Sequence, residues 1–169
     1  QRTLLLTALG RAGVAPREVG CTEAHGTGTA LGDPTEAGAR GGAQGTARAR
    51  GGARGGGGLG GAGRAARGGG RGALAAGSVK ANSGHAEPAA GMTGLLKLAL
   101  GLRVGEAAPN AQLRLLNPHV GGTLRGVACE VPVQLAAVTI GSGGVSSFGY
   151  SGTIAHAVLA FGRDSGSEA

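Results

Sequence analysis

The chain has 169 residues, of which 39 are Gly and 6 are Pro, about twice the usual share of these two types. Residues 41–72 hold 16 Gly and one large apolar residue, Leu59, which leaves about 137 residues for a single modest core. The chain has 3 aromatic residues, so that core must be aliphatic. No apolar run is long enough to cross a membrane and no signal peptide is visible. We therefore expect an intracellular location, in the cytoplasm or a plastid, and a chain that lacks its true start because it begins with Gln1.

The net charge of +7 arises from an arginine-rich tract at residues 40–71. Without the arginines of this tract, 9 basic and 9 acidic residues remain, so the charge indicates no basic binding face on the folded part. Cys21 and Cys129 form no CxxC motif and are expected to be reduced, buried thiols. The tract's arginines are Arg40, Arg48, Arg50, Arg54, Arg64, Arg67 and Arg71.

The first part of the chain predicts a helix, a strand and the start of a second helix. Residues 3–12 carry a helical apolar pattern, residues 18–24 read as a short strand, and residues 26–34 are a loop by composition. Asp33 is a plausible N-cap, with Pro34 in the first turn and Glu36 at N3. We expect this helix to end quickly in a disordered insertion over about 40–72, which has no side chains to offset its ordering entropy.

The second part predicts a strand at 73–79, a polar loop at 80–88 and a helix at 88–103 with a wide apolar face. An extended connection is expected at 105–122, and short strands at 126–133, 136–141 and 153–161. Residues 142–152 read as a loop. Alternating strands and helices predict an α/β domain over residues 1–163, followed by a tail at 164–169.

Two histidines follow predicted strand ends in glycine-bearing loops, His25 in EAHGTGT and His85 in KANSGH. Open α/β sheets bind ligands beyond the carboxyl ends of their strands. Thr27 and Thr29 add hydroxyl groups, and Lys80 could supply a fixed positive charge. Two neutral imidazoles aimed at one oxygen would stabilise an enolate, whereas the alternative is that each merely satisfies a loop hydrogen bond.

Three segments, EAHGTGTALGDPTEA (23–37), GSVKANSGHAEPAAG (77–91) and VSSFGYSGTIAHAVL (145–159), resemble the C-terminal motif blocks of β-ketoacyl synthases. The likeness is greatest to ketosynthase domains of modular polyketide synthases and animal-type fatty acid synthases, and it covers nearly the whole chain except 38–72. It implies the C-terminal half of a thiolase-like fold and a homodimer in the complete domain. It also implies acyl transfer by decarboxylative Claisen condensation with a malonyl-type acyl carrier protein. No metal or diffusible cofactor is expected, because phosphopantetheine arrives on the carrier protein.

The resemblance also assigns roles to individual residues. His25 and His85 match the two histidines of the family's Cys-His-His triad, and Lys80 matches its supporting lysine. Tyr150 matches the gating position of the acyl oxyanion hole. The implied substrate-binding residues are Thr27, Thr29, Asn82, Phe148 and Tyr150.

The departures from the family are equally specific. The nucleophilic cysteine belongs to the missing N-terminal half, and Cys21 falls on a strand instead. Ile154 replaces a family Asn, and His156 reads as structural. A non-catalytic, degenerate or truncated fragment therefore stays open as an alternative. A third reading is an Arg/Gly-rich nucleic-acid-binding segment at 53–58 and 65–72, which is disfavoured because no aromatic residue lies between 38 and 72.

Overall fold

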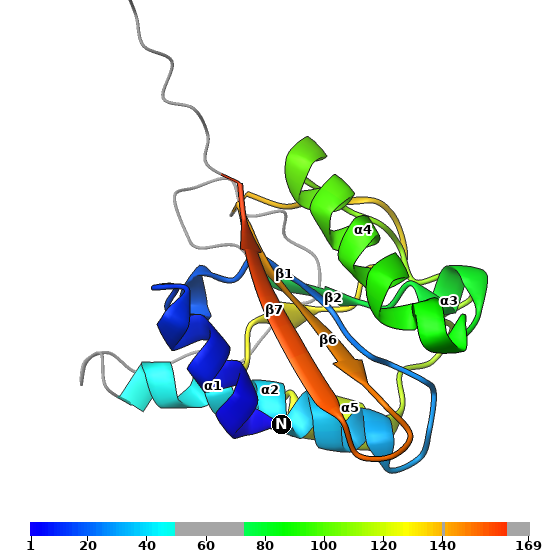
Figure 1. The fold of residues 1–169 in the computed structure, drawn as a ribbon, viewed down its shortest axis with the longest axis horizontal. Helices are drawn as coiled ribbons and strands as arrows, with labels where there is room; N and C mark the ends of the chain where they lie inside the picture. Colours follow the sequence, from blue (N-terminus) through cyan, green and yellow to red (C-terminus); the bar gives the residue numbers. More distant parts are fainter. Residues whose placement is uncertain (50–72, 140, 162–169) are drawn as a thin grey trace, which may run out of the picture.

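The computed structural model describes residues 1–49, 73–139 and 141–161, and its centre is a five-stranded sheet in the order β4-β2-β1-β6-β7 (Figure 1). The first four of these strands run parallel, and β7 is antiparallel to β6. A separate two-stranded ladder pairs β3 with β5. The strands are β1 (Cys21–Glu23), β2 (Leu74–Gly77), β3 (Glu106–Ala107), β4 (Cys129–Glu130), β5 (Ala136–Ala137), β6 (Ser142–Phe148) and β7 (Ile154–Ala160).

Helices cover both faces of the sheet, so the described part is a three-layered α/β unit, as the sequence predicts. Helix α4 (Ala90–Val104) lies on one face, and α1 (Arg2–Arg11), α2 (Gly32–Ala49) and α5 (Pro118–Thr123) lie on the other (Figure 1). The core is aliphatic and small: Leu98 and Leu102 of α4 pack on one face, and Leu9 and Leu74 meet on the other. Among the described residues no helix is long and apolar enough to span a bilayer.

Strand β6 overturns the prediction that the segment from residue 142 is a loop. Its sequence SGGVSSF has the composition of a turn, yet it lies between β1 and β7 with its first five residues buried. A Cβ at Gly143 would lie 2.7 Å from Leu98 Cδ1, and one at Gly144 would lie 2.8 Å from His156 Cε1. The glycines are therefore required by close packing on both faces of a central strand.

Helix α2 corrects the predicted start of the insertion. It continues to Ala49, and Arg40 and Ala43 are buried within it. Gly41 allows α2 to approach α5, because a Cβ there would lie 2.7 Å from the Thr123 carbonyl oxygen. The rest of the expected insertion, residues 50–72, and the predicted tail at 164–169 lie outside the described residues.

Two further helices occupy segments that the sequence suggested were irregular. The short α3 (Lys80–Ser83) begins in the predicted loop at 80–88, and the 3-10 turn Glu87–Ala89 leads into α4. Helix α5 interrupts the predicted extended connection, with Pro118 in its first turn and the Asn117 side chain accepting from His119 N. Both helices are too short for an apolar period to reveal them.

Candidate active site

The ends of three adjacent strands bring His25, His85 and Phe148 together. His25 follows β1, His85 follows α3 after β2, and Phe148 ends β6. The imidazole centroids of His25 and His85 are 5.8 Å apart with the rings nearly perpendicular, at 86°. The Phe148 ring centroid lies 5.2 Å from that of His25. The structure thus places the two predicted histidines side by side at the carboxyl edge of the parallel strands.

Backbone donors determine which nitrogen of each histidine carries its proton. Phe148 N donates to His25 Nδ1 at 3.3 Å, and Glu87 N donates to His85 Nδ1 at 3.0 Å. A ring nitrogen that accepts a hydrogen bond is unprotonated, so the proton of each neutral ring lies on Nε2. Both histidines are therefore arranged to donate a hydrogen bond from Nε2.

Lys80 lies within the site and influences His25 directly. Its Nζ donates to the His25 carbonyl oxygen at 2.5 Å. Burial, and next the positive charge of Lys80, lower the pKa of His25, which favours its neutral form. Burial also lowers the pKa of Lys80, while Glu23, Glu36 and Asp33 oppose that shift. Lys80 thus lies beside His25, and its supporting role stays a prediction.

Two carboxylates of α2 hold the backbone of the His25 loop. The buried Glu36 side chain accepts from His25 N at 2.9 Å and from Gly26 N at 3.1 Å. Asp33 accepts from Gly28 N with both oxygens, at 3.2 and 3.1 Å. The expected N-cap at Asp33 is wrong, because α2 already begins at Gly32. The acidic residues that suggested a helix start instead organise the loop that carries the histidine.

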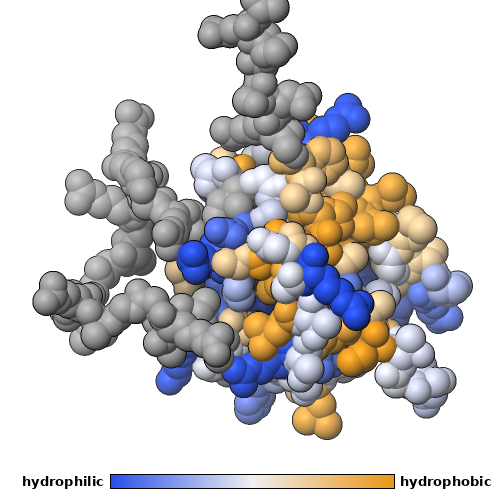
Figure 2. Space-filling view, turned by 60° about the vertical axis from the view of Figure 1, so that its left-hand side comes forward, coloured by the Kyte–Doolittle hydropathy of each residue, from blue (hydrophilic) through white to orange (hydrophobic). Residues whose placement is uncertain are grey.

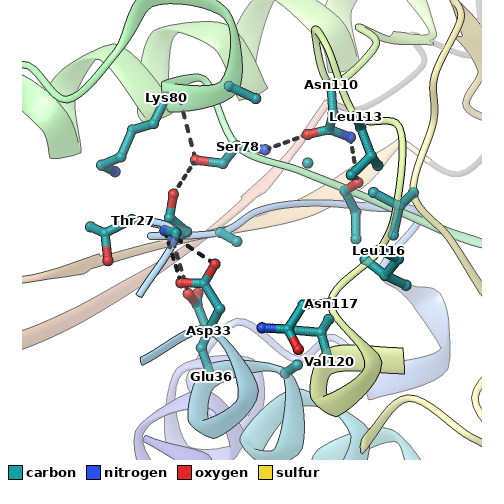
Figure 3. Close-up of a pocket in the computed structure, with 18 of the residues that line it drawn as sticks. Thr27, Asp33, Glu36, Ser78, Lys80, Asn110, Leu113, Leu116, Asn117 and Val120 are labelled. Atoms are coloured by element: carbon teal, nitrogen blue, oxygen red, sulfur yellow. Dashed lines mark hydrogen bonds between the residues drawn. The ribbon is translucent and has the colours of Figure 1, made fainter. Parts of the chain in front are cut away.

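Gly26 is the tightest point of this loop. Its φ is +46°, and a Cβ there would lie 2.8 Å from Ser78 Cβ and 3.0 Å from Ser78 Oγ. Ser78 Oγ also donates to the Gly26 carbonyl oxygen at 3.4 Å (Figure 3). The backbone of the loop after β1 consequently touches the Ser78 side chain of the loop after β2, and only glycine fits at this contact.

A second set of polar side chains ties these loops to the rest of the fold, and sequence reasoning did not identify it. The buried Glu23 accepts from Lys97 Nζ of α4 at 2.7 Å and from Val79 N. Asn110 accepts from Ser78 N at 3.1 Å and donates to the carbonyl oxygens of Ala76 and Pro132 (Figure 3). In the sequence, Glu23 was visible only as an acid within a predicted strand, and the residues it meets are remote along the chain.

A cavity of about 660 Å³ opens next to the histidine loops. One wall is polar and includes Thr27, Lys80 and His85, while the opposite wall is formed by leucine and valine side chains from the 113–124 segment (Figure 3). Glu36 and Asp33 reach the cavity from α2.

The other residues named from the sequence lie in different surroundings. Thr29 is exposed, and its Oγ1 accepts from Gly32 N at 3.1 Å. The exposed Asn82 donates to the Pro109 carbonyl oxygen at 3.0 Å. Tyr150 is fully exposed at the tip of the β6–β7 hairpin. Their substrate-binding roles stay predictions.

Neither cysteine has the surroundings of a nucleophile. Cys21 is buried under α4, and burial together with the negative charge of Glu23 raises its pKa to about 11. Burial also raises the pKa of Cys129. A thiol attacks as its thiolate, so both groups are held in the unreactive form.

Within the described ranges no cluster of side chains could hold a metal ion. The arginine- and glycine-rich segments at 53–58 and 65–72 lie outside those ranges, so the nucleic-acid hypothesis stays untested.

Comparison with known proteins identifies relatives in polyketide synthesis. The chain is 37% identical over 166 residues to a phenolphthiocerol/phthiocerol polyketide synthase protein of Mycobacterium tuberculosis, and the match covers 97% of this chain and 8% of that protein. It is 36% identical over 163 residues to an erythronolide synthase of Saccharopolyspora erythraea, covering 95% of this chain and 4% of the relative. The chain therefore spans a small part of the curated relatives that it matches.

Solved ketosynthase structures share the fold. An oxazolomycin ketosynthase domain of Streptomyces albus superimposes with a TM-score of 0.73 at 32% identity, covering 95% of this chain and 26% of that one. Ketosynthase twelve of the bacillaene polyketide synthase of Bacillus amyloliquefaciens gives 0.75 at 28% identity, covering 96% and 26%. The family model described as "Beta-ketoacyl synthase, C-terminal domain" matches residues 1–53 and 60–114. The chain belongs to the β-ketoacyl synthase family, of which it contains the C-terminal, thiolase-like part.

Proposed function

We propose that this chain supplies the histidine half of the active site of a ketosynthase, an acyltransferase that elongates acyl chains in polyketide or fatty acid synthesis. The observation that carries the proposal is the His25–His85 pair, 5.8 Å apart, with each Nδ1 occupied by a backbone donor. Each ring is thereby left with an Nε2–H to present to one substrate oxygen.

The proposed reaction begins with a malonyl-type thioester on an acyl carrier protein. Its C–CO2⁻ bond breaks, carbon dioxide leaves, and the bonding electron pair forms an enolate with its negative charge on the thioester oxygen. Two Nε2–H donors directed at that oxygen stabilise the charge as it develops. The enolate carbon then forms a bond to the carbonyl carbon of an acyl-cysteine thioester, and the cysteine thiolate leaves.

The electrostatics of the site support this role for a neutral His25. His25 must donate from Nε2 while Nδ1 accepts from Phe148 N, and this requires an uncharged ring. Burial and the nearby Lys80 charge both lower the pKa of His25 and so favour that form. Lys80 also anchors the His25 carbonyl, which makes it a positioning group as well as a source of charge.

The nucleophile must come from outside the described residues of this chain, because the thiols of Cys21 and Cys129 have raised pKa values.

Helix α4 offers the surface against which another part of a ketosynthase would pack. Large apolar side chains are exposed on the molecule as broad hydrophobic areas (Figure 2). On α4 four of them recur at every fourth position, opposite the buried face, and are 56–62% exposed. They are Met92, Leu96, Leu100 and Val104.

We expect the N-terminal ketosynthase half, with its active-site cysteine, to cover this stripe, and the complete domain to form a homodimer. The phosphopantetheine arm of the carrier protein would enter beside Thr27, which lines the cavity next to the histidines. An intracellular location, in the cytoplasm or a plastid, stays a prediction.

The test uses the complete ketosynthase that contains this segment and measures carbon dioxide release from malonyl carrier protein. His25→Ala and His85→Ala are each expected to lower the decarboxylation rate by about 10²- to 10³-fold, the usual effect of losing one oxyanion donor. His119→Ala is the matched control, since this histidine is exposed on α5. Full activity in both active-site variants would show that the assigned roles are wrong. An inactive wild-type protein that is folded would instead favour the non-catalytic alternative.

A further inference from the structure

Arg40 is a buried cation in the middle of α2, where the sequence suggested the start of a disordered insertion. The residue is 6% exposed. Its Nη2 lies 3.7 Å from Glu36 Oε1 and donates to Ser146 Oγ of β6 at 3.2 Å. A buried guanidinium needs such partners to compensate for its loss of hydration. The two partners lie on different elements, far apart along the chain, so Arg40 joins α2 to the central strand.

Both elements joined by Arg40 hold His25, at different points. On the α2 side, Glu36 accepts from the backbone N of His25 and thus determines where its main chain lies. On the β6 side, Phe148 N donates to His25 Nδ1 and thus determines the orientation of the ring. Phe148 is two residues beyond Ser146 on the same strand. The contacts therefore close a circuit from His25 through Glu36, Arg40 and β6 back to the His25 ring.

The chemistry of the guanidinium suits this link. Its several N–H groups have fixed directions, so one side chain can face a carboxylate and a hydroxyl at the same time. Ser146 Oγ, which accepts from Arg40, also lies 3.0 Å from His156 Nδ1 on β7. Burial, with a contribution from the Arg40 charge, lowers the pKa of His156 to about 4. His156 is consequently neutral near pH 7 and places no second positive charge beside the guanidinium.

We propose that Arg40 is a positioning residue for the ketosynthase reaction. By bridging Glu36 to Ser146, it keeps the His25 imidazole and the His25 backbone in the correct position relative to each other. The inference rests on the function proposed above. Arg40 acts through His25 and touches no reacting atom. Its loss is expected to reduce turnover of bound substrate and to leave substrate affinity nearly unchanged.

The test is a comparison of kcat and KM for malonyl carrier protein decarboxylation in the complete ketosynthase, together with the melting temperature of each variant. Arg40→Met is expected to lower kcat by about 10- to 100-fold, the range for a displaced catalytic group, with KM nearly unchanged. Arg40→Lys, which keeps the charge and places its donors on a single nitrogen, should recover part of the loss. Arg17→Met removes an exposed arginine of the 3-10 turn before β1 and is the matched control.

Ser146→Ala keeps the result interpretable if Arg40→Met does not fold, because it cuts the same link while leaving the Glu36–Arg40 pair in place. It should lower kcat in the same direction, and the double variant Arg40→Lys/Ser146→Ala should be no slower than the slower single variant. Unchanged kcat in folded Arg40→Lys and Ser146→Ala would overturn the inference, and so would a rise in KM alone. An inactive wild type, or a fully active His25→Ala, would refute the proposed function instead.

Discussion

Replacing Gly26 by alanine should damage both the stability and the activity of the ketosynthase, by an amount that the structure divides into two parts. The φ of +46° at Gly26 costs an alanine about 1–2 kcal/mol. The added Cβ would lie 2.8 Å from Ser78 Cβ, which is not the end of a flexible side chain. Relieving such an overlap moves backbone and costs a further 1–3 kcal/mol, roughly. The expected loss of folding free energy is therefore about 2–5 kcal/mol in total.

Gly28→Ala is the matched control for this substitution. Gly28 has a φ of +78°, yet a Cβ added there would meet nothing within 4 Å, so only the conformational cost applies. The double variant Gly26→Ala/Ser78→Gly removes the steric cost and keeps the conformational cost, because it lacks the side chain that the new Cβ meets. It should recover the steric part when it is compared with Ser78→Gly alone.

The assay is thermal unfolding of the complete ketosynthase variants, followed by decarboxylation of malonyl carrier protein. Gly26→Ala should melt at a lower temperature than Gly28→Ala, and it should lose about 100-fold in kcat, since the shifted loop carries His25. Equal melting temperatures and equal activities for the two alanine variants would refute the argument that the loops after β1 and β2 touch at this point.

Three further predictions concern the surroundings of the site. Glu23→Gln should lower the melting temperature, because it leaves Lys97 without its carboxylate. The double variant Glu23→Gln/Lys97→Met should be destabilised by less than the sum of the two single variants. Strict additivity would argue against a coupled pair. The pKa of His25 is lowered from its ordinary value of 6.5. Decarboxylation activity should therefore be lost on acidification with a midpoint below pH 6.5. Lys80→Met should move that loss to higher pH, and an unmoved profile would contradict the assigned influence. Leu96→Glu, at a 56% exposed position, should weaken binding of the N-terminal half in size-exclusion chromatography, whereas an unchanged complex would place that half elsewhere.

The sequence predicted the elements whose patterns are local. Helix α4 has enough apolar residues at helical spacing to be recognised, and α1, β1, β2 and β7 fall within or close to their predicted ranges. The loops of His25 and His85 were likewise identifiable, because glycine-rich polar segments after short strands indicate a ligand site in an α/β fold. Their placement side by side follows from the parallel pairing of β1 with β2.

What the sequence missed depends on contacts between distant segments. Strand β6 has few strand-forming residues and exists because α4, β1 and β7 enclose it closely enough to require glycine. Helix α2 extends past Arg40, although its composition predicts disorder, because α1 and α5 pack against it and bury one side of it.

The same dependence on distant contacts distinguishes the identity of the site residues from the way they are held in place. The sequence predicted the candidate catalytic side chains, because two histidines and a lysine follow strand ends in glycine-bearing loops. How His25 is held follows from tertiary contacts. Glu36 is 11 residues away from it and Phe148 is 123 residues away. A hydrogen bond between such positions leaves no local pattern, because it depends on the packing of the whole sheet.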